Sequence, residues 1–525
     1  MLSVVPYVFG EVRPGKPVRI FGRTDRLKKV PAIRVRDCNS AAMRPQAKYV
    51  LYWMTANRRV THNFALDRAI EHCGELRKPL VVFEALRCGY EWASDRMHRF
   101  VIDGMADNSA ACERAGVTYF PYLEPKGGDG HGLLEALARE ACVVVTDEYP
   151  CFFLPRMVAA AAKKLKVRLE AVDSCGMLPL RATERIFTMA HSFRRFLQKT
   201  LPDHLGEMPE ETPLKKARGL EGAKIAPEIL KKWPLADSKL LAGADGTLAN
   251  FPIDHSVAPS SIRGGENAAR KRMKDFFEVG FPHYGTQRNE PEKDGQSGLS
   301  PYLHFGFIST HEIFAEIVKR EKWTPAKLAV RAHGSREGWW NMSANAEGFL
   351  DEVITWREVG YNFSSHSDKY DDYDSLPDWA KKTLREHARD ERQHLYSLEE
   401  LENARTYDAL WNAAQMQLVR EGRIHNYLRM LWGKKILEWS RSPKDALKAL
   451  IHLNNKYGLD GRDPNSYSGI FWCLGRYDRA WGPERAIFGK IRYMSSENTA
   501  RKVRVKNYTK KYSTSVAKTA LIVLI

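Results

Sequence analysis

Tryptophan is the residue type whose number and spacing first indicate chemistry in this chain. There are thirteen tryptophans, and Trp432 and Trp439 are seven residues apart in a stretch of helical periodicity. Residues at that spacing face the same way about 10 Å apart along a helix, and Trp411 belongs to the helical stretch just before. A row of indoles can pass electrons in short steps. Large aromatic side chains at helical spacing also fill ordinary cores, and spacing alone does not decide between these readings.

A second group combines one carboxyl group with three further indoles. Glu352 and Trp356 are four residues apart, so they share one face of a predicted helix. Trp472 and Trp481 lie in GIFWCLGRYDRAWGPER, a stretch rich in glycine and arginine. An extruded nucleobase requires aromatic surfaces that stack on the base and arginines that bind the flanking phosphates. The alternative is a salt-bridged helix surface with a buried tryptophan pair.

Two polar stretches in the same half of the chain suit a phosphate-containing cofactor. In GQSGLSPYLHFGFIS, the hydroxyl groups of Ser297 and Ser300 precede a helix and can hold phosphate oxygens together with backbone N–H groups. The turn-rich LNNKYGLDGRDPNSY lies between apolar helices, so we expect its polar side chains to face a site. These side chains are Asn454, Asp460, Asp463 and Asn465. Arg429 can neutralise one of the carboxylates while both face a cofactor ring.

The N-terminal part alternates between apolar, β-rich runs and helical stretches. Five runs, at residues 49–56, 79–86, 117–124, 142–149 and 167–172, alternate with helical stretches at 64–78, 95–116, 133–140 and 155–165. Parallel strands need crossovers and cover on both faces, so we predict an α/β domain with a doubly wound parallel sheet over residues 46–182. The turn after the first strand reads MTANRRV and no GxxxxGK motif occurs, which disfavours nicotinamide dehydrogenases and P-loop ATPases. We interpret GGDGHG, residues 127–132, as a flexible connection.

The remaining segments differ from this pattern. Residues 183–262 are rich in proline and charge and are predicted to form an interdomain linker. Helical patterns dominate residues 263–500, which we predict to be an all-α domain. Residues 1–45 are a basic N-terminal extension and residues 501–525 a C-terminal tail, and the sequence assigns no role to either.

Composition narrows the class of protein. A surplus of 82 Lys and Arg over 64 Asp and Glu gives a net charge of +18, which favours a polyanionic partner such as nucleic acid without proving one. The eight cysteines form no CxxC pair and no cluster at zinc spacing, so we expect a reduced, intracellular protein without a metal. No apolar run approaches the roughly 20 residues of a membrane span, and the start lacks the features of a secretory signal.

Four long motifs occur in a fixed order and carry a family resemblance. SGLSPYLHFGFIS, WNAAQMQLVREGRIHNYLRMLWGKKILEW, LNNKYGLDGRDPNSYSGIFW and DRAWGPERAIFGKIRYM, together with YVLYWMTANRRVTHNFAL, resemble the class II cyclobutane pyrimidine dimer photolyases of the photolyase/cryptochrome family. The resemblance covers about residues 46–500. It implies an antenna-binding N-terminal domain and a helical domain that binds FAD and DNA. The implied activity is that of a carbon–carbon lyase, in which fully reduced, anionic FAD gives an electron to a flipped-out dimer in DNA under light.

The resemblance also implies roles for individual residues. The residues implied to bind the cofactor are Tyr284, Ser297, Leu299, Ser300, Arg429, Asn454, Asp460 and Asp463. The lesion pocket is implied to contain Glu352, Trp356, Met430, Trp472 and Trp481, with the Glu352 carboxyl group hydrogen-bonded to a thymine carbonyl. Trp432, Trp411 and Trp439 resemble the electron relay that photoreduces the flavin, and Tyr396 resembles an additional terminal donor.

The expected partner is DNA damaged by ultraviolet light, and the expected state is a monomer. The expected location is intracellular, and it is the cytoplasm or nucleoid if the host is a prokaryote. An antenna chromophore, 8-hydroxy-5-deazaflavin or a folate, is expected without assigned contacts. The spacing between Trp472 and Trp481 is one residue shorter than in many members, which affects the shape of that loop. The main alternative is a cryptochrome-like light sensor without repair activity, but such a sensor could lose the lesion pocket whose residues remain here. A (6-4) photoproduct enzyme would need a histidine pair that the motifs lack, and a non-catalytic nucleic-acid-binding protein would be colourless.

Overall fold

The computed structural model describes residues 29–217, 222–244, 246–293 and 295–513. Within these residues one six-stranded sheet has the order β1-β6-β5-β2-β3-β4. The strands are β1 (Val35–Asp37), β2 (Tyr49–Met54), β3 (Leu80–Leu86), β4 (Thr118–Leu123), β5 (Ala141–Glu148) and β6 (Leu169–Asp173). Strands β2 to β6 are mutually parallel, which confirms the five predicted strands. The prediction missed β1, which pairs antiparallel with β6 and comes from the segment interpreted as an extension.

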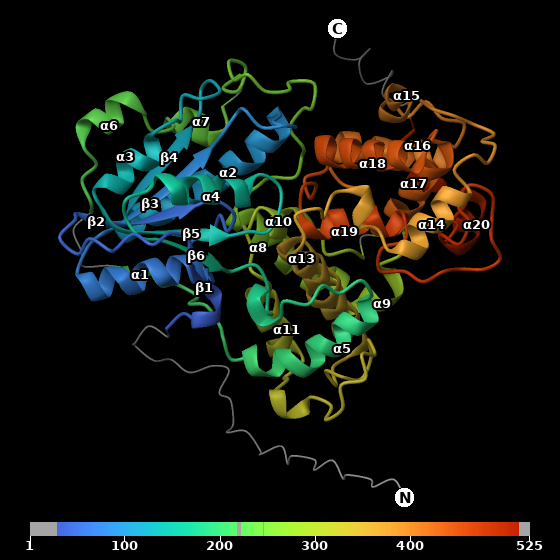
Figure 1. Cartoon of the computed structure of the whole chain (residues 1–525), viewed down its shortest axis with the longest axis horizontal. Helices are drawn as coiled ribbons and strands as arrows, with labels where there is room; N and C mark the ends of the chain where they lie inside the picture. The colour runs from blue at the N-terminus through green and yellow to red at the C-terminus, as the bar shows by residue number, and fades with distance from the viewer. Residues whose placement is uncertain (1–28, 218–221, 245, 294, 514–525) are drawn as a thin grey trace, which may run out of the picture.

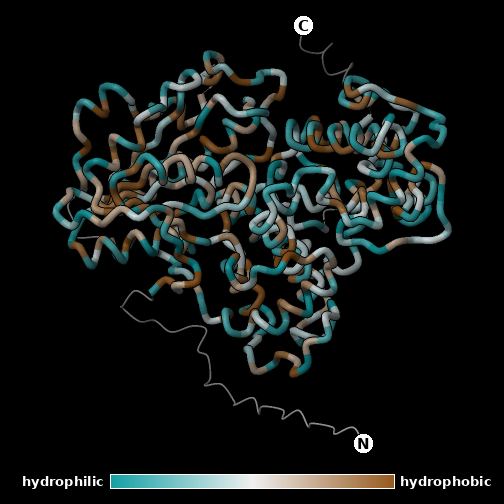
Figure 2. The backbone as a smooth tube through the Cα atoms, in the orientation of Figure 1, coloured by the Kyte–Doolittle hydropathy of each residue, from teal (hydrophilic) through white to brown (hydrophobic). Residues whose placement is uncertain are grey.

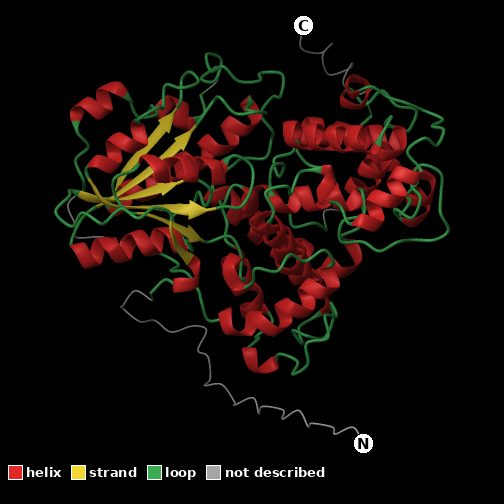
Figure 3. Ribbon diagram, viewed as in Figure 1, coloured by secondary structure: helices red, strands yellow, loops and turns green. Residues whose placement is uncertain are grey.

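Helices cover both faces of the sheet, as Figures 1 and 3 show for the blue and teal part of the chain. They are α1 (Phe64–Leu76), α2 (Asp95–Ala115), α3 (Leu133–Arg139) and α4 (Leu154–Lys164). Because side chains alternate along a strand, Val50, Tyr52 and Met54 of β2 pack on the α1 side. Tyr49, Leu51 and Trp53 of the same strand pack on the side of α3 and α4. Figure 2 shows the resulting hydrophobic strands inside a more hydrophilic periphery.

The turn between β2 and α1 is fixed by a buried carboxylate. Asp147 at the end of β5 accepts hydrogen bonds from the backbone N–H groups of Thr55, Ala56 and Asn57, at 2.7, 2.8 and 3.1 Å. A side chain therefore satisfies the N–H groups that would otherwise be available to a bound phosphate. This arrangement explains why MTANRRV needs no glycine-rich sequence.

After β6, every named element of the described chain is a helix, and the helices are joined by long loops. The segment predicted as a linker contains α5 (Ala190–Thr200), α6 (Pro227–Lys232) and α7 (Ser238–Ala242). The following helices are α8 (Glu266–Asp275), α9 (Tyr284–Gln287), α10 (Ser300–His304), α11 (Thr310–Arg320), α12 (Ala344–Leu350), α13 (Arg357–His366), α14 (Asp378–Glu386) and α15 (Leu398–Glu402). The last are α16 (Ala409–Glu421), α17 (Asn426–Trp439), α18 (Pro443–Tyr457), α19 (Pro464–Cys473), α20 (Ser496–Lys502) and α21 (Lys506–Lys511).

Helix α19 lies at the centre of the helical part, where it packs against α13, α17 and α18. Two buried arginines of the α/β part fasten the two parts together. Arg59 donates a hydrogen bond to the Gly306 carbonyl at 2.9 Å, and Arg96 donates to the carbonyls of Val419 and Tyr457 at 2.7 and 2.9 Å. The cavities described below therefore lie in a framework joined by buried hydrogen bonds.

Helix α21 extends the helical part into the segment expected to be a tail. It packs on α16, and Tyr508 donates a hydrogen bond to Gln417 at 2.7 Å. All eight cysteines lie in the described ranges and are free thiols. Among the helices of the described residues, none combines the length and apolarity that crossing a bilayer would need.

Candidate active site

A cavity of about 510 Å³ lies in the helical part, and we call it the central cavity. Its volume is within the range of small-molecule binding sites. Eight of the residues singled out in the sequence line it, namely Tyr284, Ser297, Ser300, Glu352, Arg429, Asp460, Asp463 and Asn465. They come from helices and loops far apart in the chain, so the fold brings together side chains that the sequence separates by up to 181 positions.

The lining of the central cavity is rich in basic side chains. The cations that line the cavity are Arg263, Lys271, Arg272, Arg288, Arg357, Arg423 and Arg429. Arg272 donates hydrogen bonds to the backbone carbonyls of Gln296 and Ser297, at 2.6 and 2.7 Å. Gly298 has φ +65° and a Cβ atom there would lie 2.7 Å from Arg272 Nε, so only glycine fits this turn. Sequence reasoning did not select Arg272, although the basic run at residues 270–274 could have indicated it.

The predicted arginine–carboxylate pair is present on another wall of the cavity. Arg429 Nη2 contacts both carboxylate oxygens of Asp460, at 2.8 and 3.0 Å. Asn454 is buried and does not line the cavity. Its amide donates a hydrogen bond to Ser466 Oγ at 2.6 Å, and Ser466 does line it. Leu299 is likewise buried behind the wall, so these two predicted residues can act only through their neighbours.

Asp463 links the central cavity to the α/β part. Its carboxylate accepts hydrogen bonds from the hydroxyl groups of Tyr149 and Tyr361, at 3.0 and 3.2 Å. Burial would raise the pKa of this carboxyl group. The hydrogen bond with His304 and the charge of Arg357 outweigh burial, so its pKa lies below the ordinary value. Asp463 is therefore a charged acceptor held in place from two sides.

A second cavity of about 330 Å³ adjoins the first, and we call it the aromatic cavity. Trp356 and Trp472 form one wall, stacked with ring centroids 4.6 Å apart and an interplanar angle of 16°. This spacing leaves no room for a ring between the two indoles, so a ligand must lie against the pair. Met430 also lines this cavity. Five residues line both cavities, namely Arg288, Glu352, Asn426, Arg429 and Asn465.

Glu352 stands where the two cavities meet. Its carboxylate accepts a hydrogen bond from Arg288 at 2.7 Å. Burial raises the pKa of Glu352, an effect that Asp351 strengthens and the Arg288 charge partly opposes. Glu352 and Trp356 lie in a π-helical segment, η8 (Asp351–Trp356), instead of the α-helix that their spacing suggested. π-Helical turns are rare and occur frequently at functional sites.

The structure places Trp481 beside the aromatic cavity and not in its wall. It lines a neighbouring hollow of about 300 Å³, which shares Tyr427, Arg492 and Met494 with the aromatic cavity. Its indole N–H donates to Asp478 at 2.9 Å. The guanidinium groups of Arg479 and Arg492 lie over the indole, 4.5 and 5.1 Å from the ring centroid. This hollow combines an aromatic surface with positive charge.

The three indoles of the predicted relay are buried, and in space Trp411 lies between Trp432 and Trp439. Trp411 donates its indole N–H to the carbonyl of Trp432 at 3.0 Å, and its ring lies 5.4 Å from that of Trp439. Tyr396 and the exposed Tyr407 lie 5.3 and 5.7 Å from Trp439. Trp432 lines neither the central nor the aromatic cavity. The ring contacts form a path from Trp411 through Trp439 to the exposed Tyr407, and Trp411 is joined to Trp432 by a hydrogen bond to the backbone carbonyl. Sequence spacing alone did not show that Trp411 lies between the other two indoles.

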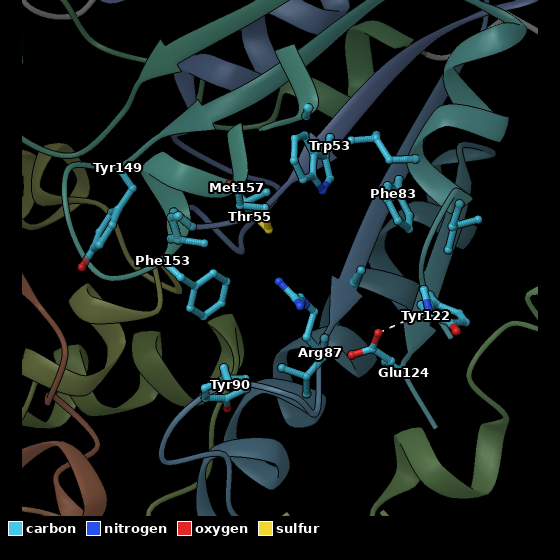
Figure 4. A pocket seen from close by; sticks show the side chains of 18 of the residues that line it. Trp53, Thr55, Phe83, Arg87, Tyr90, Tyr122, Glu124, Tyr149, Phe153 and Met157 are labelled. Carbon is cyan, nitrogen blue, oxygen red and sulfur yellow. Dashed lines mark hydrogen bonds between the residues drawn. The ribbon is translucent and has the colours of Figure 1, made fainter. Parts of the chain in front are cut away.

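A third cavity, of about 340 Å³, lies at the carboxyl ends of the parallel strands, and we call it the strand-edge cavity. Figure 4 shows Trp53, Tyr90 and Phe153 around its open centre, with the side chain of Arg87 extending between them. Strand order reverses between β2 and β5, and ligands of open α/β sheets bind at such a point. Gly130, His131 and Gly132 also line it, so the interpretation of GGDGHG as a connection overlooked this position.

The chain is similar to curated proteins named deoxyribodipyrimidine photo-lyase. It is 34% identical over 480 residues to the one from Methanothermobacter thermautotrophicus, with coverage of 91% of this chain and 98% of that protein. It is 31% identical to the one from Potorous tridactylus (96% and 90% covered) and 33% identical to the one from Arabidopsis thaliana (87% and 88%). No protein-family model matches the chain. The crystal structure of a class III photolyase from Agrobacterium tumefaciens shares the fold, with a TM-score of 0.61, 18% identity and coverage of 90% and 88%.

Proposed function

This chain belongs to the photolyase/cryptochrome family, and we propose that its central and aromatic cavities place FAD beside a flipped-out pyrimidine dimer. The chain is an enzyme, a lyase that uses light to repair pyrimidine dimers in DNA. The observation that carries the proposal is the meeting of the two cavities at Glu352 and its neighbours. A cofactor in the central cavity and a flipped-out pyrimidine dimer in the aromatic cavity would be in contact there.

The residues of the central cavity fit FAD by the chemistry of their side chains. The basic side chains of the lining, with the hydroxyl groups of Ser297 and Ser300, suit a pyrophosphate. Gly298 lets Arg272 lie close against the turn that carries Ser297, because a Cβ atom there would clash with the guanidinium group. The Arg429–Asp460 pair offers one donor and one acceptor to a polar ring. When bound, a reduced flavin supplies the light-excited electron that opening of a cyclobutane ring requires.

The chain's own residues then have distinct tasks at the lesion. The stacked Trp356 and Trp472 give the dimer an apolar surface and exclude water. Glu352, whose pKa is raised, can donate or share a proton at a thymine carbonyl oxygen where negative charge develops. Trp481, flanked by Arg479 and Arg492, binds DNA next to the flipped-out bases. The long-range charge of +18 attracts the phosphate backbone.

Two further assignments complete the proposal. Electrons pass inward from Tyr396 through Trp439 and Trp411 to Trp432, which supplies the reducing equivalents that repair needs. The strand-edge cavity holds an antenna chromophore, because aromatic walls and Arg87 suit a planar, anionic ring. We propose 8-hydroxy-5-deazaflavin or a folate as this chromophore, as the sequence resemblance implied. We also propose that the chain belongs to class II of the family.

The test is an absorption spectrum of the purified protein followed by illumination. We expect flavin bands, with an added band if the antenna is present. The reduced protein under blue light should convert an oligonucleotide with one thymine dimer to the undamaged form. A coloured protein that leaves the dimer intact would indicate a light sensor, and a colourless protein that binds DNA would indicate a non-catalytic function.

A further inference from the structure

Lys434 is a charged side chain in an unusual position. It lies on α17 and its side chain is completely buried. Its ammonium group donates hydrogen bonds to the carbonyl oxygens of Cys473 and Trp472, at 2.7 and 3.4 Å. Among the described residues it forms no ion pair with a carboxylate. Lysine is rarely buried without a partner of opposite charge, so the position calls for a function.

We propose that Lys434 is the positioning residue that holds Trp472 in place for recognition of the dimer. This inference rests on the proposed function, because Trp472 is one of the residues assigned to the lesion. Lys434 does not touch the lesion itself. It acts through the end of α19, where its hydrogen bonds are made.

The contact with Trp472 is made at the C-terminus of α19. The last carbonyl groups of a helix have no partner within the helix, and they carry the negative end of its dipole. The last turn of α19 contains no basic residue of its own. Lys434 supplies the missing positive charge from the neighbouring helix and fixes the turn that bears Trp472. The indole of Trp472 is thereby held against Trp356 in the aromatic cavity.

The two helices approach closely at this point. A Cβ atom at Gly433 would lie 2.3 Å from the sulfur of Cys473. The close approach brings the base of Lys434 next to α19, so its four-carbon chain reaches the last turn from the side. Water is excluded from this contact, because Cys473 and Lys434 are both buried.

The charge of Lys434 changes within an accessible pH range. Burial lowers the pKa of Lys434 to about 8, while Cys473 and Asp478 raise it and Arg492 lowers it. The Cys473 thiol, on α19, has a pKa raised by burial to about 11, so it stays neutral over this range. Lys434 is consequently charged below pH 8 and neutral above it. Its hydrogen bonds to Trp472 and Cys473 weaken as the pH rises through 8.

The experiment measures binding in the dark, so that no dimer is repaired. The FAD-loaded full-length protein is titrated with an oligonucleotide that contains one thymine dimer and with the same oligonucleotide undamaged, from pH 6.5 to 9.5. The ratio of the two affinities reports dimer recognition, and the flavin spectrum reports cofactor binding. The variants are Lys434→Met and Lys434→Arg. The matched control is Lys435→Met, which removes the next buried ammonium group on α17, one that pairs with Glu438 and not with α19.

We expect the dimer preference of the natural protein to fall about fivefold between pH 7 and pH 9. Lys434→Met should lose about tenfold at every pH, because the Cys473 carbonyl group loses its donor and the Trp472 carbonyl group keeps only the backbone N–H of Gly475. Lys434→Arg should keep the preference and lose the pH dependence, and Lys435→Met should behave like the natural protein. A flat profile in the natural protein, or an unchanged preference in Lys434→Met, would overturn the inference. If Lys434→Met does not fold, the natural profile and Lys434→Arg still decide. Equal binding of both oligonucleotides by the natural protein would contradict the proposed function itself.

Discussion

Replacing Glu352 by glutamine removes the one carboxyl group that, among the described residues, lines both the central and the aromatic cavity. The substitution keeps the size of the side chain. Its effect on stability follows from the Arg288 contact, in which the two side chains are 21% and 32% exposed. An ion pair with that exposure contributes about 0.2 to 1 kcal/mol, so the fold and flavin binding should survive.

The effect on repair is a separate quantity. A hydrogen bond that involves a charged group contributes about 1 kcal/mol more than a hydrogen bond between two neutral groups, and this difference corresponds to about fivefold in rate. We therefore expect Glu352→Gln to split dimers about fivefold less efficiently, with unchanged flavin content. The assay counts dimers split per absorbed photon in the chemically reduced protein, with dimer binding measured separately in the dark.

The matched control is Glu316→Gln. Glu316 on α11 forms an ion pair with Arg320 at 2.6 Å, the two side chains are 26% and 37% exposed, and neither residue lines the two cavities. This control loses a comparable charge pair away from the site and should repair normally. Normal repair by Glu352→Gln would refute the role of this carboxyl group, and loss of flavin would show that Glu352 serves the cofactor.

The remaining predictions concern the relay and the packing of α17. Trp432→Phe should abolish photoreduction and still permit repair after chemical reduction, and photoreduction at the normal rate in this variant would remove Trp432 from the path. Gly433→Ala should lower the free energy of unfolding by about 1 to 3 kcal/mol through overpacking against Cys473, as denaturant titration can measure. Adding Cys473→Ala should restore most of that loss, and a failure of this rescue would show that the clash is not with the sulfur.

The sequence predicted the parallel strands well because each is a nearly continuous apolar run, buried on both faces. It missed β1 because that strand has only three residues, Val35–Asp37, two of them charged, and is held by the edge of the sheet alone. Edge strands of this kind carry no periodic signal. Their existence depends on a neighbour that is contributed by a distant part of the chain.

Most of the predicted cofactor-binding residues line the central cavity, but the sequence could not show which of them lie in the wall and which lie behind it. Asn454 and Leu299 lie in motifs together with residues that line the cavity, and only packing places them behind the wall. Arg272 was missed because a basic residue on a helix is usually exposed. Here it donates a hydrogen bond to the carbonyl of Gln296, 24 residues away. Lys434 was missed for the opposite reason, since a sequence does not show that a lysine is buried.

The π-helical segment η8 holds one residue more than regular α-geometry would need. One additional residue in a regular α-helix rotates everything beyond it by about 100°. The wider π-turn absorbs that residue, so α12 and α13 on either side keep nearly the relation of an uninterrupted α-helix. Deleting one residue in η8 would close the helix into regular α-geometry and should leave Trp356 near its partner indole. Relatives can therefore differ by one residue in this interval without changing the relation of α12 to α13.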